Sequence, residues 1–299
     1  MSEVAAFDCG TNTIKLLVGD LPEVSVRESR IVRLGQGVDA TGRMSDEALG
    51  RAFAAIDEYA AILDSHDVAR IRFCATSATR DSSNADVFGE GVHARLGVWP
   101  EVLSGSEEAA LAYDGAVRNL RTPPEFPVLV VDIGGGSTEL VLGDAAGPTA
   151  AQSMDMGSVR MHERYLTVDP PSPEAVSACV ADIDAHLDAC PVPVASAATV
   201  VAVAGTALSI TAGVLDLATY DKSVIDQSVV AAADVHAFVD RLVAMPIAER
   251  LTFGWMHPGR VDVLGAGGLI LSRVLRRCSA TTMVASEADI LDGIAWSMV

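Results

Sequence analysis

Some hydrophobic positions form short continuous runs typical of buried strands, and others recur at the spacing of a helix. This mixture of patterns predicts an α/β protein. Residues 128–131 and 200–203 are short aliphatic runs of the kind that form buried strands, and residues 71–76 predict another strand. Over residues 45–63 apolar side chains recur at helical spacing, and Ser45 is a suitable N-cap. The stripe consists of Leu49, Phe53, Ile56, Tyr59 and Leu63. We expect it to face a core.

Helix-start signals and prolines divide the rest of the chain. Residues 106–120 predict a helix that opens with two acids, and Ser172 followed by Pro173 predicts the start of another. Residues 286–289 resemble a capping box at the start of the last helix. Three prolines within residues 121–127 indicate a connector.

The segment 189–215 contains no charged residue and is long enough to span a membrane as a helix. However, Pro191 and Pro193 lie within it, its residues are mostly small, and it breaks at Gly205. We therefore expect a buried strand followed by a buried helix, and no membrane partner.

An internal duplication is visible near the start of the chain. Residues 8–20 align without gaps, at an offset of 124, to residues 132–144, and five of thirteen positions are identical. Each copy is an apolar strand ending in Asp, a Gly/Ser/Thr/Asn turn and a second apolar strand. This pattern predicts two equivalent β-hairpins.

The two turns are candidate phosphate-binding sites. Their glycines accept positive φ and let backbone N–H groups point inward. Hydroxyl and amide side chains add further donors, namely Thr11, Asn12, Thr13, Ser137 and Thr138. The alternative is an ordinary hairpin turn, but two copies, each beside an acid, favour phosphate.

Composition narrows the class of protein. The 299 residues include 21 Lys and Arg against 40 Asp and Glu, a net charge of −19, which argues against generic nucleic-acid binding. Half of the residues are hydrophobic, enough for one large or two ordinary globular domains. Five scattered cysteines without metal-like spacing, and an amino terminus without a basic region, predict the reducing cytoplasm as the location.

Several short motifs, in this order and spacing, resemble the exopolyphosphatase/guanosine pentaphosphate phosphohydrolase (Ppx/GppA) family. They lie at residues 8–13, 75–80, 103–109, 131–139, 157–160, 204–206, 220–221 and 260–267. The resemblance implies the actin/hexokinase/Hsp70-like fold, two duplicated ribonuclease-H-like domains with an interdomain cleft. We place the first domain at 1–124 and the second at 125–285, with the last helix, 286–299, as a candidate addition to the first.

The resemblance also implies an activity. A family member of this kind removes terminal phosphate from inorganic polyphosphate with Mg²⁺, for which Mn²⁺ can substitute, or removes the 5′-phosphate of pppGpp. It further implies a homodimer. The chain looks like a short form of the family, because the longer members add carboxy-terminal helical domains. We therefore expect a preference for short polyphosphate.

Site residues follow from the same motifs. Glu108 matches the family's catalytic base, although acids at a helix start are often only surface charges that favour the dipole. Asp8, Asp132 and Glu139 are candidate magnesium ligands, since Mg²⁺ prefers oxygen. The remaining candidates bind phosphate: Thr11, Asn12, Thr13, Lys15, Arg80, Gly134, Gly135, Gly136, Ser137, Thr138, Arg160, Gly205 and Thr206.

Two other classes stay open at this point. A small-molecule kinase can use the same fold, but we recognise no acceptor-substrate segment and no adenosine pocket in the sequence. A (p)ppGpp-binding sensor without turnover is the second alternative, and Glu108 argues against a pure binder.

Overall fold

The computed structural model describes residues 3–299 and divides the chain into two compact units. Unit 1 comprises Met1–Gly115 together with Ile290–Val299, and unit 2 comprises Ala116–Asp289. The domain boundary that we placed between residues 124 and 125 stays a prediction.

Unit 1 is built on a five-stranded sheet with the order β3-β2-β1-β4-β5. The strands are β1 (Glu3–Cys9), β2 (Thr13–Asp20), β3 (Glu23–Ile31), β4 (Val68–Ala75) and β5 (Glu101–Val102). β1, β2 and β3 are antiparallel neighbours, whereas β4 runs parallel to β1 and β5 parallel to β4. The first predicted hairpin, β1–β2, is confirmed.

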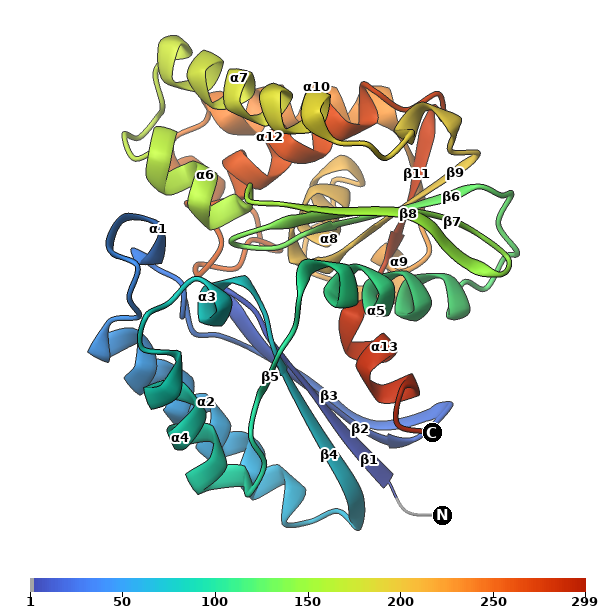
Figure 1. Cartoon of the computed structure of the whole chain (residues 1–299). Coiled ribbons are helices and arrows are strands. Elements are labelled where there is room, and N and C mark those ends of the chain that lie inside the picture. Colours follow the sequence, from blue (N-terminus) through green and yellow to red (C-terminus); the bar gives the residue numbers. More distant parts are fainter. Residues whose placement is uncertain (1–2) are drawn as a thin grey trace. The chain divides into compact units, whose positions relative to one another are not determined.

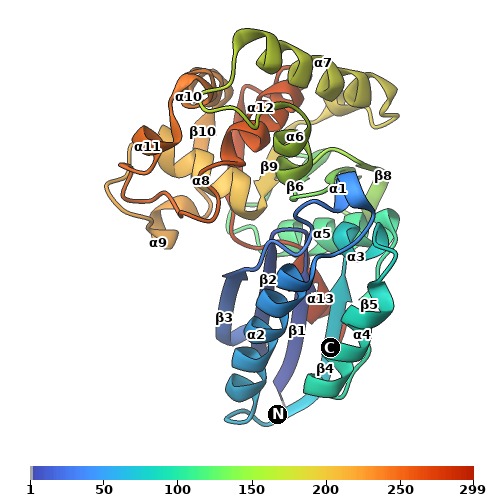
Figure 2. The same cartoon turned by 90° about the vertical axis from the view of Figure 1, so that its left-hand side faces the viewer.

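Helices cover both faces of this sheet. They are α1 (Val38–Thr41), α2 (Asp46–Leu63), α3 (Ser77–Arg80), α4 (Ala85–Leu96), α5 (Gly105–Arg118) and α13 (Ile290–Trp296). The last turn of α5, from Ala116 on, already belongs to unit 2. In Figure 2, α2 lies in front of β1 and β2 and α13 lies behind them. Successive residues of β1 alternate accordingly: Phe7 belongs to the core under α2, and Ala6 belongs to the core under α13.

Unit 2 repeats this arrangement around a six-stranded sheet of order β10-β11-β9-β6-β7-β8. Its strands are β6 (Val128–Ile133), β7 (Thr138–Asp144), β8 (Gly147–Met154), β9 (Thr199–Val203), β10 (Val229–Ala231) and β11 (Thr282–Ser286). β8-β7-β6-β9-β11 corresponds to β3-β2-β1-β4-β5 in order. A β-bulge at Val18/Gly19 recurs 124 residues later at Leu142/Gly143. The predicted duplication is confirmed.

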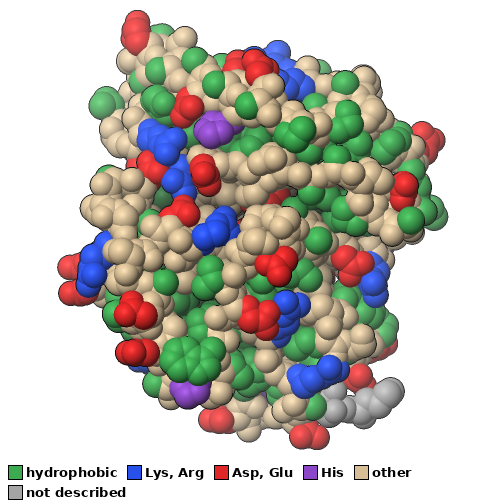
Figure 3. Space-filling model, in the orientation of Figure 1, with side chains coloured by type: hydrophobic (Ala, Val, Ile, Leu, Met, Phe, Trp, Pro, Cys, Tyr) green, Lys and Arg blue, Asp and Glu red, His purple; other side chains and the backbone are tan. Residues whose placement is uncertain are grey.

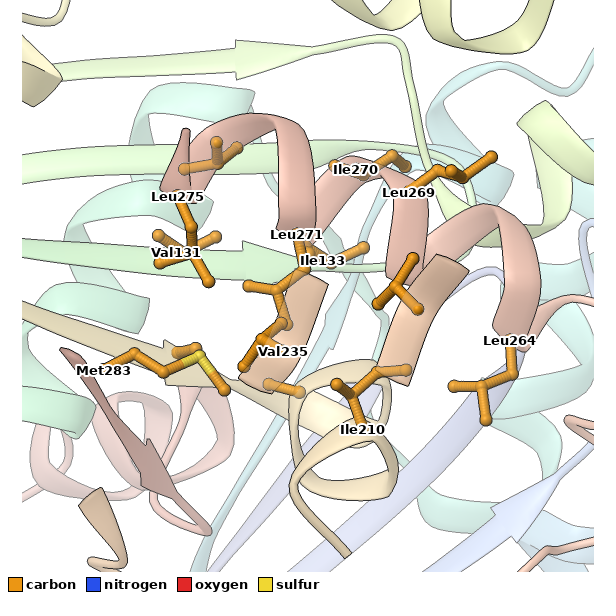
Figure 4. Close-up of a cluster of buried hydrophobic side chains, with 14 of the residues drawn as sticks. Val131, Ile133, Ile210, Val235, Leu264, Leu269, Ile270, Leu271, Leu275 and Met283 are labelled. Atoms are coloured by element: carbon orange, nitrogen blue, oxygen red, sulfur yellow. The ribbon is translucent and has the colours of Figure 1, made fainter. Parts of the chain in front are cut away.

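The helices of unit 2 enclose a large aliphatic core. They are α6 (Ser158–Tyr165), α7 (Pro173–Ala189), α8 (Ala204–Val214), α9 (Lys222–Ile225), α10 (Ala232–Ala244), α11 (Ile247–Arg250) and α12 (Leu264–Leu275), with a 3₁₀ turn at Val194–Ser196. Figure 1 shows α7, α10 and α12 on one side of the sheet. α12 contributes Leu264, Ile270 and Leu271 to the buried cluster that also contains Val131 and Ile133 (Figure 4).

The uncharged segment 189–215 folds as strand β9 followed by helix α8, as its prolines and small residues predict. α8 is only 11 residues long. Within residues 3–299, helices that combine the length and the apolar composition needed to cross a bilayer are absent.

Most of the helix starts agree with the sequence, and one differs. The hydroxyls of Ser45 and Ser172 accept hydrogen bonds from the third residue of their helices, as expected of N-caps. The prediction for the last helix is wrong, because α13 begins at Ile290 and Ser286 ends strand β11. Ser286 pairs with Val203 in the sheet, and its hydroxyl bonds locally to Ala288. The pairing of β11 with β9 therefore overrides the local capping pattern.

Candidate active site

In unit 2, the turn between β6 and β7 packs closely against the start of α6. The N–H of Gly134 donates to the carbonyl of Ser137 at 3.0 Å, and the N–H groups of Ser158 and Val159 donate to the carbonyls of Gly134 and Gly135, each at 2.9 Å. A Cβ at Gly157 would lie 2.4 Å from the carbonyl carbon of Gly135. The turn therefore keeps its shape only while position 157 lacks a side chain.

The conformational role that we expected of the turn glycines is wrong. Within residues 3–299 the glycines with positive φ are Gly37, Gly42, Gly97 and Gly147, and the turn at 134–136 is not among them. Glycine serves a close approach of two backbones here, because Gly135 and Gly136 both lie against Gly157.

Two predicted phosphate ligands stabilise this turn with their own side chains. The hydroxyl of Thr138 donates to the carbonyl of Met156 at 2.6 Å, and Nε of Arg160 donates to the carbonyl of Gly136 at 2.8 Å. Ser137 is almost fully buried beside them. The turn is thus held in place before any ligand is bound.

Asp132 and Glu139 lie directly opposite each other on β6 and β7. Their exposed fractions are only 7% and 2%. Because Val131 and Ile133 face the hydrophobic core, Asp132 points to the other face of the sheet. A hydroxyl from β8 reaches the second acid, since Oγ of Ser153 donates to Oε1 of Glu139 at 2.7 Å.

The donor set of this pair fits a magnesium ion. Mg²⁺ is commonly held by one or two carboxylates, with water and substrate phosphate completing six oxygen ligands. In residues 3–299, groups of three or more His, Cys, Asp and Glu side chains arranged to hold a metal do not occur. Asp132 and Glu139 are two such carboxylates on paired positions of neighbouring strands.

The corresponding pair in unit 1 has a different charge. Lys15 occupies the position opposite Asp8, and its Nζ lies 3.0 Å from Oδ2 of Asp8. An ammonium at this distance competes with a metal ion for the carboxylate. Cys9, the next residue, is buried in the core as expected, and burial together with Asp8 raises the pKa of its thiol.

The turn of unit 1 is held by hydrogen bonds to neighbouring loops. Oγ1 of Thr11 lies 2.8 Å from Oγ of Ser77, and the N–H of Gly10 donates to the carbonyl of Thr13 at 2.9 Å. The carbonyl of Asn12 accepts from Val32 and from Arg33, each at 2.9 Å. The three predicted ligands of this turn, residues 11–13, thus belong to one ordered loop.

Glu108 lies in the first turn of α5 and is 7% exposed. Nη1 of Arg80 lies 3.3 Å from Oε2 of Glu108 and donates to the carbonyl of Leu103 at 2.8 Å. The structure therefore brings the predicted base and one predicted phosphate ligand into contact. This contact was not expected from the sequence.

Glu107 differs from its neighbour. It is exposed, and one of its carboxylate oxygens accepts from the N–H of Ser104 at 3.0 Å and from the Ser104 hydroxyl at 2.7 Å. These hydrogen bonds from the Ser104 backbone and side chain lower the pKa of Glu107. Glu107 thus caps the helix, and the role of Glu108 as the catalytic base stays a prediction.

Gly205 and Thr206 lie at the start of α8, where Ala204 adopts the left-handed φ of 65°. A Cβ at Gly205 would lie 2.5 Å from the guanidinium carbon of Arg260, so this side chain lies flat over the glycine. Burial lowers the pKa of Arg260, while Tyr220 and Glu287 act in the opposite direction. We did not select Arg260 from the sequence, although its motif belongs to the family pattern.

Two units of the same strand order, each opening on a hairpin with a buried acid beside its turn, define the duplicated ribonuclease-H-like class of the actin, hexokinase and Hsp70 proteins. This confirms the fold predicted from the sequence. A profile of the Ppx/GppA phosphatase family matches residues 16–299, and the chain belongs to this family.

Similar proteins agree over the whole length. Exopolyphosphatase 2 of Mycobacterium tuberculosis is 43% identical in an alignment that covers 100% of this chain and 99% of the relative. The crystal structure of an exopolyphosphatase-like protein is 41% identical with a TM-score of 0.96, covering 99% of this chain and 98% of that one. The Aquifex aeolicus Ppx/GppA protein is 27% identical with a TM-score of 0.83, covering 99% and 97%.

Proposed function

We propose that this protein is an exopolyphosphatase, which hydrolyses the terminal phosphoanhydride bond of inorganic polyphosphate and releases phosphate. The observation that supports it most directly is the buried pair Asp132 and Glu139 beside the rigid glycine turn. A polyanionic substrate approaching two carboxylates requires a cation between them. The full-length likeness to a protein named exopolyphosphatase 2 points to the same substrate.

Each group of residues then has a defined task. Glu108 orients and deprotonates the attacking water, and Arg80, in contact with it, fixes the carboxylate and attracts phosphate oxygens. Backbone N–H groups of residues 11–13 and 135–138 and the hydroxyls of Thr11 and Thr13 bind phosphate, with Lys15 and Arg160 adding positive charge. The Thr138 hydroxyl acts indirectly, because its proton goes to the Met156 carbonyl and holds the turn. To these we add Arg260, whose guanidinium lies against Gly205.

Asp132 and Glu139 would hold Mg²⁺, for which Mn²⁺ can substitute. When bound, the ion would neutralise charge on the transferred phosphoryl group and orient it. Of the three predicted ligands, Asp8 should bind the metal ion most weakly, because its carboxylate already forms an ion pair with Lys15.

A phosphate-release assay tests the proposal. Short polyphosphate, long polyphosphate, pppGpp and ATP are compared with Mg²⁺ present and after its removal. We expect the highest kcat/KM on short polyphosphate with Mg²⁺. Turnover of pppGpp above polyphosphate would favour the second activity of the family, transfer from ATP to an acceptor would indicate a kinase, and tight (p)ppGpp binding without release would indicate a sensor.

Two properties of the protein in the cell belong to the same proposal. We infer a homodimer from the family resemblance, and light scattering coupled to size exclusion tests it. We also infer a cytoplasmic location, in agreement with five cysteines that are all free thiols.

A further inference from the structure

Three strands of unit 2 place three polar residues in one row across the sheet. Asp132 on β6 pairs with Glu139 on β7, and Glu139 pairs with Ser153 on β8. The Ser153 hydroxyl points along this row, since it donates to Oε1 of Glu139 at 2.7 Å. Ser153 is therefore the next polar group outward from the carboxylate pair.

Unit 1 contains the equivalent row with one change of charge. Asp8 pairs with Lys15, and Lys15 pairs with Ser29, each 124 residues before its counterpart. Ser29 is the only residue of β3 that is identical to its counterpart in β8. In this row the acid faces an ammonium at 3.0 Å, whereas in unit 2 it faces a second acid.

Because Glu139 is an acid opposite Asp132, its side chain needs a partner that holds it in place, whereas Lys15 in unit 1 does not. Like charges directly opposite each other on a sheet repel, and burial strengthens the repulsion. A Glu side chain can turn away from this repulsion through its three torsions. A hydroxyl that donates to a charged carboxylate forms one of the stronger hydrogen bonds in proteins. Ser153 thus fixes one oxygen of Glu139, and the carboxylate is held in one orientation.

We propose that Ser153 is a positioning residue, which orients Glu139 so that it and Asp132 can bind a divalent cation together. The inference rests on the proposed function for the metal site but assigns Ser153 no contact with substrate. Hydrogen-bond partners of metal ligands orient them, and removing one typically weakens metal binding by about 10- to 100-fold.

Binding of Mn²⁺ alone tests the inference without any turnover. Metal-stripped full-length protein is titrated with Mn²⁺, and the free ion is followed by its electron paramagnetic resonance signal. Ser153→Ala is expected to raise the Kd by about 10- to 100-fold. Ser153→Thr, which keeps the hydroxyl, is expected to restore most of the affinity. Ser29→Ala removes the equivalent exposed hydroxyl of unit 1 and is expected to leave the Kd unchanged.

The outcomes separate this inference from the proposed function. An unchanged Kd in Ser153→Ala, or a wild type that does not bind Mn²⁺, overturns the role of Ser153. A wild type that releases no phosphate from polyphosphate overturns the proposed function, whatever the Kd values are. If Ser153→Ala weakens binding but Ser153→Thr does not restore it, packing explains the loss and the positioning role is again overturned.

Discussion

Two adjacent acids at the start of α5 have opposite surroundings. Glu108 is buried and lies against Arg80, whereas Glu107 is exposed and caps the helix through Ser104. A general base acts from within hydrogen-bonding reach of the proton that it takes, and we therefore keep Glu108, whose carboxylate does not serve as a helix cap, as the proposed base.

We expect Glu108→Gln to lower kcat on polyphosphate by about 10²- to 10⁴-fold with little change in KM. The amide keeps the shape of the side chain but cannot accept a proton. Steady-state phosphate release measures both constants, and Glu107→Gln is the matched control with an expected change of less than about threefold. The reverse order of effects would place the base one residue earlier.

Asp132 provides a second prediction at the residue scale. Asp132→Ala is expected to abolish turnover, because it removes one of the two carboxylates proposed to bind Mg²⁺. EDTA is expected to do the same to the wild type, because it removes the ion itself. The control is Asp144→Ala, which removes an exposed acid at the end of β7, the strand of Glu139, and should leave activity near the wild-type level. Circular dichroism checks the fold. Full activity in metal-stripped wild type would contradict the assignment.

At the scale of elements, the shape of the turn between β6 and β7 depends on how closely the start of α6 approaches it. Gly157 precedes α6 and lies against the backbone of Gly135 and Gly136. Neither backbone can move without breaking the hydrogen bonds from Ser158 and Val159 to the turn. The start of the helix therefore determines the position of the backbone N–H groups of this turn, which we propose bind phosphate.

Gly157→Ala is expected to destabilise the protein by about 1–3 kcal/mol, because the new methyl group overpacks a backbone contact. It should also lower kcat/KM by about 10- to 100-fold, since the turn is displaced. Gly50→Ala is the control: Gly50 lies within α2 with open space around it, and this substitution should stabilise the protein by about 0.5–1 kcal/mol. Urea unfolding and phosphate release give the two readouts. Unchanged activity in Gly157→Ala would show that the turn tolerates displacement.

For the whole molecule, charge is the property that bears on the substrate. The net charge is −19. On the face drawn in Figure 3, Lys and Arg side chains (blue) lie singly or in small groups, interspersed with Asp and Glu (red). An acidic surface repels the part of a polyphosphate chain that extends beyond the site. This repulsion should act on long chains more than on short ones.

We therefore expect kcat/KM per chain end to stay level or fall as polyphosphate grows from a few phosphates to hundreds, with distributive release. Gel electrophoresis early in the reaction should show a population of chains that shortens together. Added salt screens the repulsion and should reduce the disadvantage of long chains. Full-length chains persisting beside free phosphate would instead indicate a processive grip on long polymer.

The sequence by itself determined the hairpins, the duplication and the family, because each motif is a short local pattern and the order and spacing of the motifs can be compared along the chain. Alternating apolar positions and turn residues define each hairpin locally, and residues 8–20 and 132–144 are similar enough to align. The motifs also selected Glu108 over Glu107, a choice that stays a prediction, and the structure shows that Glu108 is buried and Glu107 is bonded to Ser104.

Only the tertiary structure decided which side chains meet across elements. The contact of Arg80 with Glu108 joins residues 28 apart, and the contact of Arg260 with Gly205 depends on the packing of a loop against α8. The row through Ser153 depends on how β8 pairs with β7. β8 has only one residue in common with its counterpart β3, so sequence similarity between the two halves does not reveal this pairing. Local propensity also failed at Ser286, because strand pairing in the sheet outweighs a capping pattern worth about 1 kcal/mol.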